Sequence, residues 1–277
     1  MKQFKALLTS PAFLIGTSLF VLCLFLSIAY PLITSTDPFA RVGYPFEQPS
    51  LKYWLGTNAE GQDMLAQILF GLRASMFVGI TAGLIATILG TLIGITGGYS
   101  GGLLDNILTM ATNLLLVIPS LIILILITTS IEKRSLVLVA LIIGATTWTW
   151  TARAVRAQAA SLKNREHVHL AKLNGAGTLS ILILQILPYM LSYVFMAFVM
   201  QMATGILSEA AISMLGLGPY DTVTLGQILH YAQRTEALIN GNWWAFLPAT
   251  IMVTVIAFSL YLVNTAMEGI FNPRLRK

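Results

Sequence analysis

Few side chains in this sequence have the type and spacing that metal binding or disulfide formation needs. Cys23 is the single cysteine, and His167 and His169 are two of only three histidines. Side chains two residues apart on a helix point in different directions, so these histidines do not form a zinc site. Cys23 has no internal disulfide partner and is interpreted as a small apolar core residue. We therefore predict no metal site and no disulfide.

Glu209 is the one ionisable side chain well inside the apolar helices predicted below. A carboxylate is costly to bury there, so it should face the protein interior and be paired or protonated. Together with Ser213 it would suit a gate or a translocation path. Its small neighbours Ala210, Ala211 and Ser213 favour the other interpretation, a hydrogen bond that packs helices. The histidines lie outside the predicted spans, so the catalytic pair of an intramembrane enzyme is missing.

The sequence also has one glycine-rich stretch, Gly94 to Gly102. It lacks the Lys-Ser/Thr pair with which a P-loop holds phosphate and Mg²⁺. We interpret this stretch as a flexible turn between two spans. No nucleotide site and no cofactor are expected in this chain.

Composition places these residues in a membrane. The 277 residues are 56% hydrophobic and 10% charged, which is more apolar surface than a soluble core could hide. Six runs without Asp, Glu, Lys or Arg reach or approach the ~20 residues that a helix needs to cross a bilayer. We predict an all-α polytopic membrane protein, a single domain over 1–277. Its N-terminal anchor is 12–34, and its five-helix core, 76–270, holds the spans 76–98, 107–129, 136–157, 189–214 and 244–268.

Basic residues predict the orientation of these spans. With both termini in the cytoplasm, ten of the sixteen Lys and Arg residues lie on the cytoplasmic side. Segments 35–75 and 215–243 then lie outside, and segment 158–188 lies inside. We interpret the positive charge as this topology signal, because no basic stripe interleaved with aromatic residues indicates nucleic-acid binding.

The first outer segment ends in a pattern of its own. Between 59 and 77, apolar residues recur at helical spacing with polar residues between them. This pattern predicts an amphipathic helix that lies on the outer surface and runs into the second span. The apolar residues are Met64, Leu65, Ile68, Leu69, Leu72 and Met76.

The inner segment is predicted to form two short helices separated by a glycine stop. Asn174-Gly175 favours the end of a first helix, because glycine adopts the left-handed conformation freely. A second helix is expected from Thr178 to Leu187, after which Pro188 opens the fifth span. With Leu170, Ala171 and Leu173 on its surface, such a projection suits insertion into a groove of a cytosolic partner. The same helices could equally rest on lipid headgroups, and the residues alone leave both readings open.

The inner segment resembles the EAA loop of ABC importer permeases. In that family a Glu-Ala-Ala triplet, a glycine four residues after its last alanine and an Ile-Leu-Pro ending form coupling helices that dock onto ATPase subunits. The matching stretches here are Arg153-Ala154-Val155-Arg156, Ser161-Leu162-Lys163, Val168-His169-Leu170-Ala171, Gly175-Ala176 and Ile186-Leu187-Pro188. The resemblance implies that the residues coupling to the ATPase are His169, Leu170, Ala171, Leu173, Gly175, Ala176 and Pro188.

Other stretches resemble one branch of that family, the second permease of the dipeptide, oligopeptide and nickel group. Its LGTD…GRD…G.R.S signature is matched by Leu55-Gly56-Thr57, Gly61-Gln62-Asp63 and Gly71-Leu72-Arg73-Ala74-Ser75. Its SEAALSFLGLG and DPRLR motifs are matched by the run from Ser208 to Gly218 and by Asn272-Pro273-Arg274-Leu275-Arg276. The matches follow the family's order along nearly the whole chain.

This resemblance implies a permease subunit of the prokaryotic plasma (inner) membrane that is not itself an enzyme. It would work with a second permease, two ATPase subunits that bind ATP and Mg²⁺, and an external substrate-binding protein. Peptides are the implied substrates, with nickel, opines and oligosaccharides as alternatives carried by some members. A self-sufficient secondary transporter is the other class considered, but inverted repeats and broken, charged helices are not visible in the sequence.

The sequence departs from the family pattern at several charged positions. His169 replaces the acidic residue of the triplet, so its contact with the ATPase cannot be carried over. Asn58 replaces the signature Asp, and Gln62 and Gln67 replace two arginines. Docking through shape and apolar contact is still expected, whereas the substrate class is left open.

Overall fold

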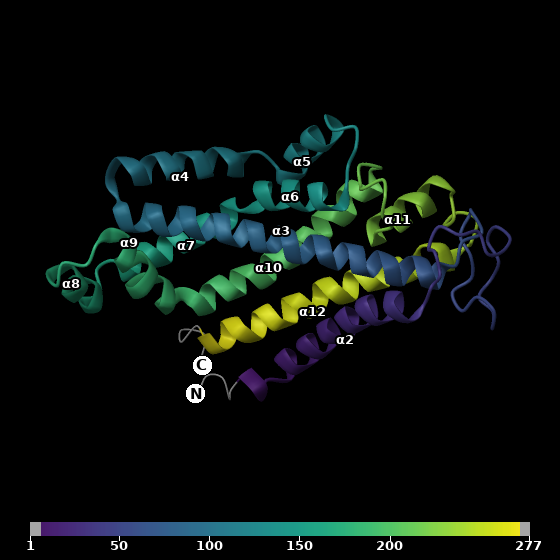
Figure 1. Cartoon of the computed structure of the whole chain (residues 1–277), viewed down its shortest axis with the longest axis horizontal. Helices are drawn as coiled ribbons and strands as arrows, with labels where there is room; N and C mark the ends of the chain where they lie inside the picture. The colour runs from purple at the N-terminus through teal and green to yellow at the C-terminus, as the bar shows by residue number, and fades with distance from the viewer. Residues whose placement is uncertain (1–6, 272–277) are drawn as a thin grey trace.

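The computed structural model describes residues 7–271, and the regular elements in this range are all helices. They form an elongated bundle (Figure 1). Isolated β-bridges join Arg41 to Gln62 and Thr57 to Asp63. The helices are α2 (Pro11–Ile33), α3 (Met64–Ser100), α4 (Gly102–Val117), α5 (Ser120–Thr129), α6 (Leu136–Thr147), α7 (Thr149–Leu162), α8 (Glu166–Leu173), α9 (Thr178–Ser180), the π-helix η1 (Ile181–Ile186), α10 (Leu187–Met214), α11 (Leu225–Arg234), the 3₁₀ turn η2 (Trp243–Ala245) and α12 (Leu247–Phe271).

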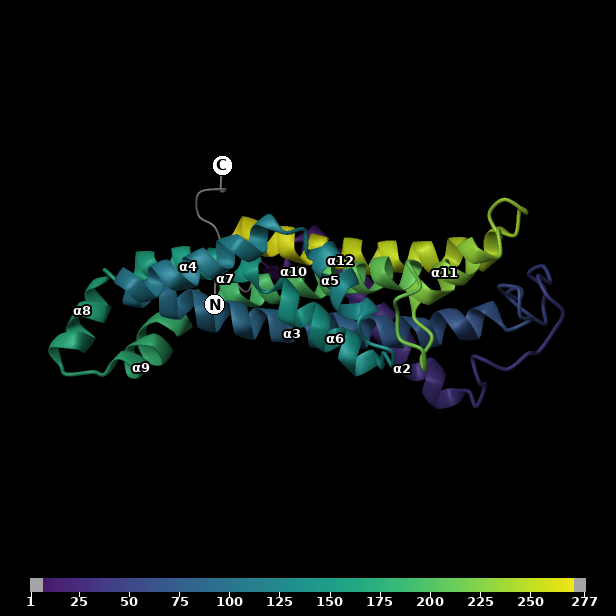
Figure 2. The same ribbon diagram turned by 90° about the horizontal axis from the view of Figure 1, so that it is seen from above.

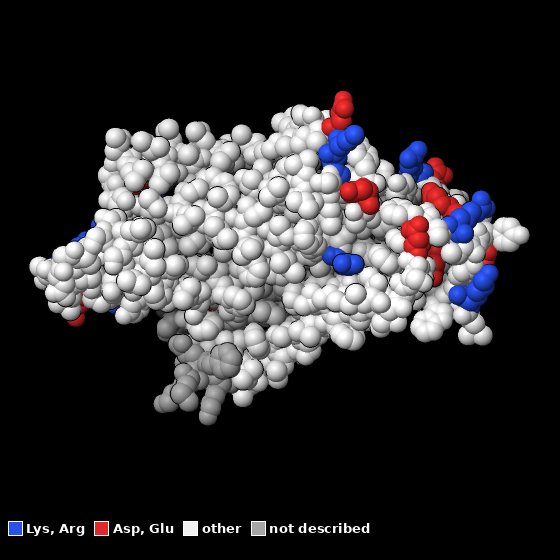
Figure 3. All heavy atoms as spheres, in the orientation of Figure 1, with Lys and Arg blue, Asp and Glu red and all other residues white. Residues whose placement is uncertain are grey.

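The helices confirm an all-α polytopic membrane protein. Four of them are long and apolar enough to cross a bilayer: α2, α3, the continuous stretch Thr178–Met214, and α12. Two bent pairs, α4 with α5 and α6 with α7, raise the number to six if each pair is one span. On the face shown in Figure 3, charged side chains gather toward the ends of the bundle and leave most of the middle uncharged.

The segments expected as spans over 107–129 and 136–157 are therefore helical but bent, and each counts as a span only if its pair is taken together. The axes of α4 and α5 meet at 81°, and those of α6 and α7 at 44°. Pro119 explains the first break, because a proline disfavours helical conformation in the residue before it, and Ile118 is extended. At the second break the hydroxyls of Thr146 and Thr147 donate to carbonyls one turn back, which favours a bend.

Helix α3 differs from the sequence prediction at both of its ends. Asp63 caps its first turn by accepting from the Leu65 N–H at 2.9 Å, and the helix then runs for 37 residues without a break. The helix predicted over 59–77 does run into the second span, but its placement on the outer surface is wrong, because that pattern is the buried start of α3. The predicted glycine turn is also shorter than expected, since only Gly101 and Gly102, with φ of +68° and +60°, leave the helix.

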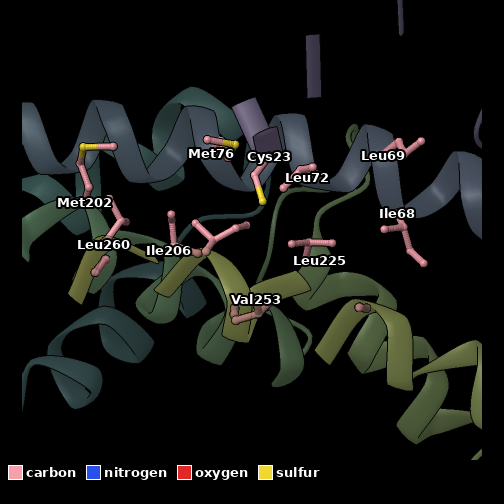
Figure 4. Packing of buried hydrophobic residues seen from close by; sticks show 14 of the residues in the cluster. Cys23, Ile68, Leu69, Leu72, Met76, Met202, Ile206, Leu225, Val253 and Leu260 are labelled. Carbon is pink, nitrogen blue, oxygen red and sulfur yellow. The ribbon is translucent and has the colours of Figure 1, made fainter. Parts of the chain in front are cut away.

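Glycines let α3 approach its neighbours closely. A Cβ added at Gly83 would lie 2.8 Å from the backbone nitrogen of Met202 in α10. At Gly94 it would lie 2.6 Å from the carbonyl oxygen of Ala152 in α7. Small residues of this kind bring helix backbones together in membranes. Apolar side chains from α2, α3, α10, α11 and α12 fill the adjacent core, as Figure 4 shows.

The loops divide between two ends of the bundle. Helix α2 begins and α12 ends toward the end that carries α8, here called the α8 end (Figure 1). Segment 35–63 and α11 lie at the opposite, α11 end, where Trp244 Nε1 donates to the Thr57 carbonyl at 3.1 Å. Helix α11 was not predicted within 215–243. Its signals are the capping Thr224, which accepts from the Gln227 N–H at 3.1 Å, and apolar residues at helical spacing. The basic residues at positions 2, 5, 274, 276 and 277 lie outside the described range.

Candidate functional site

The predicted coupling residues other than Pro188 cluster in a projection of the α8 end, here called the knob (Glu166–Ser180), which extends beyond the neighbouring helices (Figures 1 and 2). Its turn follows from Gly175, whose φ of +78° is left-handed. The Ala176 N–H donates to the Ala171 carbonyl and the Gly175 N–H to the Lys172 carbonyl, both at 3.0 Å. These two bonds make a Schellman motif, so the predicted glycine stop after the first helix is confirmed.

The tip of the knob presents apolar side chains to the surroundings. Leu170, Leu173 and Leu179 are 60%, 82% and 70% exposed. His169 is also exposed. Of the predicted coupling residues, only Ala171 and Ala176 pack inward, against the cluster that backs the knob. The knob therefore combines a wide leucine surface with a fixed turn.

The base of the knob is held by the bundle. Val168 is fully buried among residues of α3, α7 and η1. The His167 ring stacks on Tyr189 with 4.3 Å between ring centroids, and its Nε2 lies 3.1 Å from the Gln185 carbonyl oxygen. The ammonium of Lys172 lies 5.2 Å from the ring centroid of Tyr99, near the end of α3. The knob thus packs against α3 and against the start of the long α9–η1–α10 helix.

The predicted second short helix is not separate from the fifth span. Thr178 to Met214 is one continuous span candidate, within which Ile181–Ile186 is π-helical. Pro188 explains why Ile181–Ile186 is π-helical, because proline has no N–H to donate to the carbonyl four residues back. The Leu187 N–H instead donates to the Leu182 carbonyl, five residues back. Pro188 therefore sits in the second position of α10 rather than in the knob.

Glu209 is fully buried at the junction of three helices. Its Oε2 accepts from the Ser75 hydroxyl of α3 at 2.9 Å, and its Oε1 from Ser213 in α10 at 2.6 Å. Ser75 in turn accepts from the N–H of Leu225, the first residue of α11, at 3.1 Å. The carboxylate thus links α3, α10 and α11 through hydroxyl groups, without a basic partner among the described residues.

This junction brings together two of the motifs singled out in the sequence. Ser75 ends the Gly71–Ser75 motif, and Glu209 belongs to the Ser208–Gly218 motif. Gly226 of α11 completes the contact, because a Cβ there would lie 2.7 Å from the Ala210 Cα. Ser75 and Leu225 were not identified as partners of Glu209 from the sequence, since they are 134 and 16 residues away from it.

A buried arginine holds the loop that follows this motif. Arg134, in the loop between α5 and α6, is only 6% exposed. Its guanidinium donates to the carbonyls of Thr128, Gly216 and Gly218 at 3.1, 3.4 and 3.3 Å, and to the Tyr220 hydroxyl. Arg134 therefore joins the end of α5 to the turn between α10 and α11.

The amides that replace the family's charges contact one another. Asn58 Nδ2 and Gln67 Nε2 both donate to Oε1 of Gln62, at 2.8 and 2.9 Å. Gln67 Nε2 also donates to the Pro38 carbonyl. The three substitutions thus act together, because a neutral amide chain holds segment 35–63 against the start of α3.

A cavity of about 420 Å³ lies where the two broken spans pass α10. No charged side chain lines it among the described residues. Its polar lining comes mainly from hydroxyl groups and the amide of Gln201. The lining residues are Leu115, Leu116, Ile118, Pro119, Ser120, Thr146, Thr147, Thr149, Trp150, Met200, Gln201 and Thr204. Of these residues, Trp150 was considered from the sequence as a pore-lining aromatic, whereas Glu209 and Ser213, the predicted path residues, are not part of the lining.

Comparison with known proteins gives one family. Residues 86–277 match the family model described as binding-protein-dependent transport system inner membrane component. An oligopeptide transport system permease protein OppC of Mycobacterium bovis is 32% identical over 83% of this chain and 79% of its own length. A putative peptide transport system permease protein of Brucella suis is 30% identical over 98% of this chain and 91% of its own. For OppC of Bacillus subtilis the identity is 29%, over 95% of this chain and 86% of its own.

Proposed function

The chain belongs to the family of binding-protein-dependent transport system inner membrane components, and from this premise we propose that it is a permease subunit of an ATP-driven peptide importer. The single observation that carries the coupling role is the knob, a rigid turn with an exposed leucine surface at one end of a membrane bundle. Such a surface is recognised by an apolar groove. The relatives named as oligopeptide and peptide permeases support peptides as the substrate class.

The subunit supplies half of a translocation pathway. A second, related permease would face the broken spans and close the cavity from the other side. Two ATPase subunits would bind the knobs of the two permeases, and an external binding protein would deliver the peptide at the α11 end. The chain itself contributes no P-loop, so ATP and Mg²⁺ belong to the ATPase subunits.

The α8 end is the cytoplasmic one in this proposal. Arg153, Arg156, Lys163, Arg165 and Lys172 all lie in the segments around the knob, as the positive-inside rule requires. The start of α2 and the end of α12 point to the same end (Figure 1). Both termini are then cytoplasmic.

Coupling follows from chain connectivity. Helix α7 leads into the knob, and α9, the last turn of the knob, continues through η1 into α10. The same two helices line the cavity, α7 through Thr149 and Trp150 and α10 through Met200, Gln201 and Thr204. A displacement of the knob by the ATPase subunits would therefore move two walls of the cavity and switch its access from one side of the membrane to the other.

Reconstitution tests the proposal. The permease pair, its ATPase subunits and the loaded binding protein are placed in liposomes, and the uptake of a labelled peptide is measured. We expect uptake that requires ATP and stops when the ATPase subunits are omitted. Uptake that persists without ATP and follows an ion gradient would instead identify a secondary transporter. Nickel and an oligosaccharide, offered in the same assay, check the substrate class.

A further inference from the structure

The part of α3 near the α11 end carries an arginine without a partner. Arg73 is exposed, and its guanidinium makes no hydrogen bond or ion pair with the part of the chain that the structure describes. It is the last charged residue before the charge-free run 74–104. One turn earlier, Phe70 packs edge-on against Tyr30, close to the end of α2, with 6.2 Å between ring centroids. Arg73 therefore lies where the helices leave the hydrocarbon layer, at the depth of lipid headgroups.

Arg73 lines a cavity of about 410 Å³ whose described lining holds one other charged side chain, Asp221. Both side chains are exposed, yet they do not form an ion pair with each other. Oδ1 of Asp221 accepts from the Thr222 hydroxyl at 3.1 Å. The cavity thus presents one cation and one anion, held apart, within a wall that is otherwise apolar. The apolar lining residues are Pro38, Phe39, Phe70, Ala74, Phe77, Leu136, Val137 and Val223.

An apolar stripe continues from this cavity along α3. Positions four or seven residues apart share one face of a helix, and the face that carries Arg73 also carries four exposed apolar residues, Phe77, Leu84, Ile88 and Leu92. At 1.5 Å per residue the stripe is about 22 Å long. One leaflet is about half of the ~30 Å hydrocarbon layer, so the stripe is long enough to hold an acyl chain over its whole depth.

We propose that the cavity and the stripe bind one glycerophospholipid with an ammonium headgroup, of the phosphatidylethanolamine type. The Arg73 guanidinium donates to the phosphate, the Asp221 carboxylate accepts from the ammonium group, and an acyl chain lies along the stripe. A transported peptide fits less well, because its main-chain N–H and C=O groups need partners and Thr222 is the one uncharged polar residue in the described lining. The lipid site does not depend on which solute the permease carries.

Native mass spectrometry of the complete transporter complex tests the site. The delipidated complex is titrated with phosphatidylethanolamine or phosphatidylglycerol, and the dissociation constants are compared between variants. We expect Arg73→Gln to weaken the binding of phosphatidylethanolamine about tenfold, the effect of one charge-assisted hydrogen bond. Asp221→Asn should still bind lipid but lose the preference for the ethanolamine headgroup, because only the ammonium contact is removed. Unchanged binding of both lipids by the Arg73→Gln complex overturns the site.

Arg234 offers the matched control. It is an exposed arginine in the last turn of α11 and does not line the cavity, so Arg234→Gln removes the same charge and should leave lipid binding unchanged. Equal weakening by both variants would assign the effect to net charge and overturn the site. A tetra-alanine peptide, whose two termini carry the same pair of charges as the headgroup, is the competitor. Displacement of the lipid by this peptide would make the cavity a peptide site instead.

Photocrosslinking keeps the proposal testable if Arg73→Gln fails to assemble. The unmodified complex is placed in nanodiscs that contain a phosphatidylethanolamine with a photoreactive group near the headgroup end of one acyl chain. We expect crosslinks on α3 between residues 70 and 77 and at the start of α6, at Leu136 or Val137. Crosslinks spread evenly around the bundle, or absent from these residues because a partner subunit covers the cavity, overturn the site.

Discussion

Replacement of Gly175 by valine should uncouple the ATPase subunits from transport. The residue has a φ of +78°, and no heavy atom lies within 4 Å of where its Cβ would be. The cost of Gly175→Val is therefore conformational and not a collision, about 1–2 kcal/mol for a β-branched residue in the left-handed region. A cost of this size lowers the population of the native turn about 5- to 30-fold. Both Schellman hydrogen bonds require this turn, so they are lost with it.

The assay compares purified complexes for the amount of ATPase subunit retained and for ATP hydrolysis stimulated by the loaded binding protein. We expect Gly175→Val to remain in the membrane, to retain less ATPase and to lose the stimulation. Gly175→Asn should recover much of the ATPase retention and of the stimulated ATP hydrolysis, because asparagine tolerates the left-handed conformation.

Gly177 offers a matched control in the same turn. Its φ of −70° and ψ of 160° are open to any residue, and a Cβ there also meets nothing within 4 Å. Gly177→Val therefore adds the same bulk without the strain and should behave normally. The reasoning is refuted if Gly175→Val hydrolyses ATP in response to substrate as the unmodified complex does. Equal damage from both valines would assign the effect to bulk on a docking surface.

The remaining predictions concern four other sites. Glu209→Gln should keep near-normal uptake, because the amide oxygen still accepts from one serine hydroxyl and the amide nitrogen can donate to the other. Glu209→Leu leaves both hydroxyls without a partner at a cost of about 1–3 kcal/mol, measured as a lower Tm; an assembled Gln variant without uptake would indicate a gate that needs the charge. Arg134→Met should loosen the α10–α11 turn and speed proteolysis there, with Lys133→Met as the exposed control; equal rates would show that the buried guanidinium is dispensable. A cysteine that replaces Leu51, which is 99% exposed, should label with an impermeant reagent only from outside. A cysteine that replaces Leu173, which is 82% exposed, should label only from inside, and the reverse pattern would invert the topology. His169→Ala should reduce ATPase retention by at most the equivalent of ~1 kcal/mol, as expected for an exposed polar contact, and a larger loss would give His169 a role of its own.

The sequence predicts the spans better than their interruptions. Runs without charge locate the four unbroken span candidates and the two bent helix pairs, because a lipid-exposed segment must be apolar along its whole length. Apolarity does not reveal the bend, however, so the break at Pro119 and the larger extent of α3 were missed. A proline in a membrane span is compatible with several geometries, and the contacts of α4 and α5 decide which one forms.

The candidate sites likewise include features that the sequence predicts and features that it does not. The turn at Gly175 is local, and its conformation follows from the residue type alone. The partners of Glu209 and the cavity beside Arg73 depend on which helices meet, so periodicity and composition could not predict them. The neutral chain through Gln62 could not be predicted either, because it depends on how segment 35–63 folds against the start of α3.

The length of α3 has a mechanical consequence. At 1.5 Å per residue its 37 residues form a rod of about 55 Å, well beyond the ~30 Å of the hydrocarbon layer. Tyr99 near one tip lies beside Lys172 of the knob, and Asp63 at the other tip adjoins the amide chain of segment 35–63. An unbroken rod pivoting within the bilayer acts as a lever, so a tilt of about 10° about its middle would move each tip by roughly 5 Å, in opposite directions. A displacement of one tip of α3 on one side of the membrane can thereby displace its other tip on the opposite side, without a chain of side-chain contacts between the two.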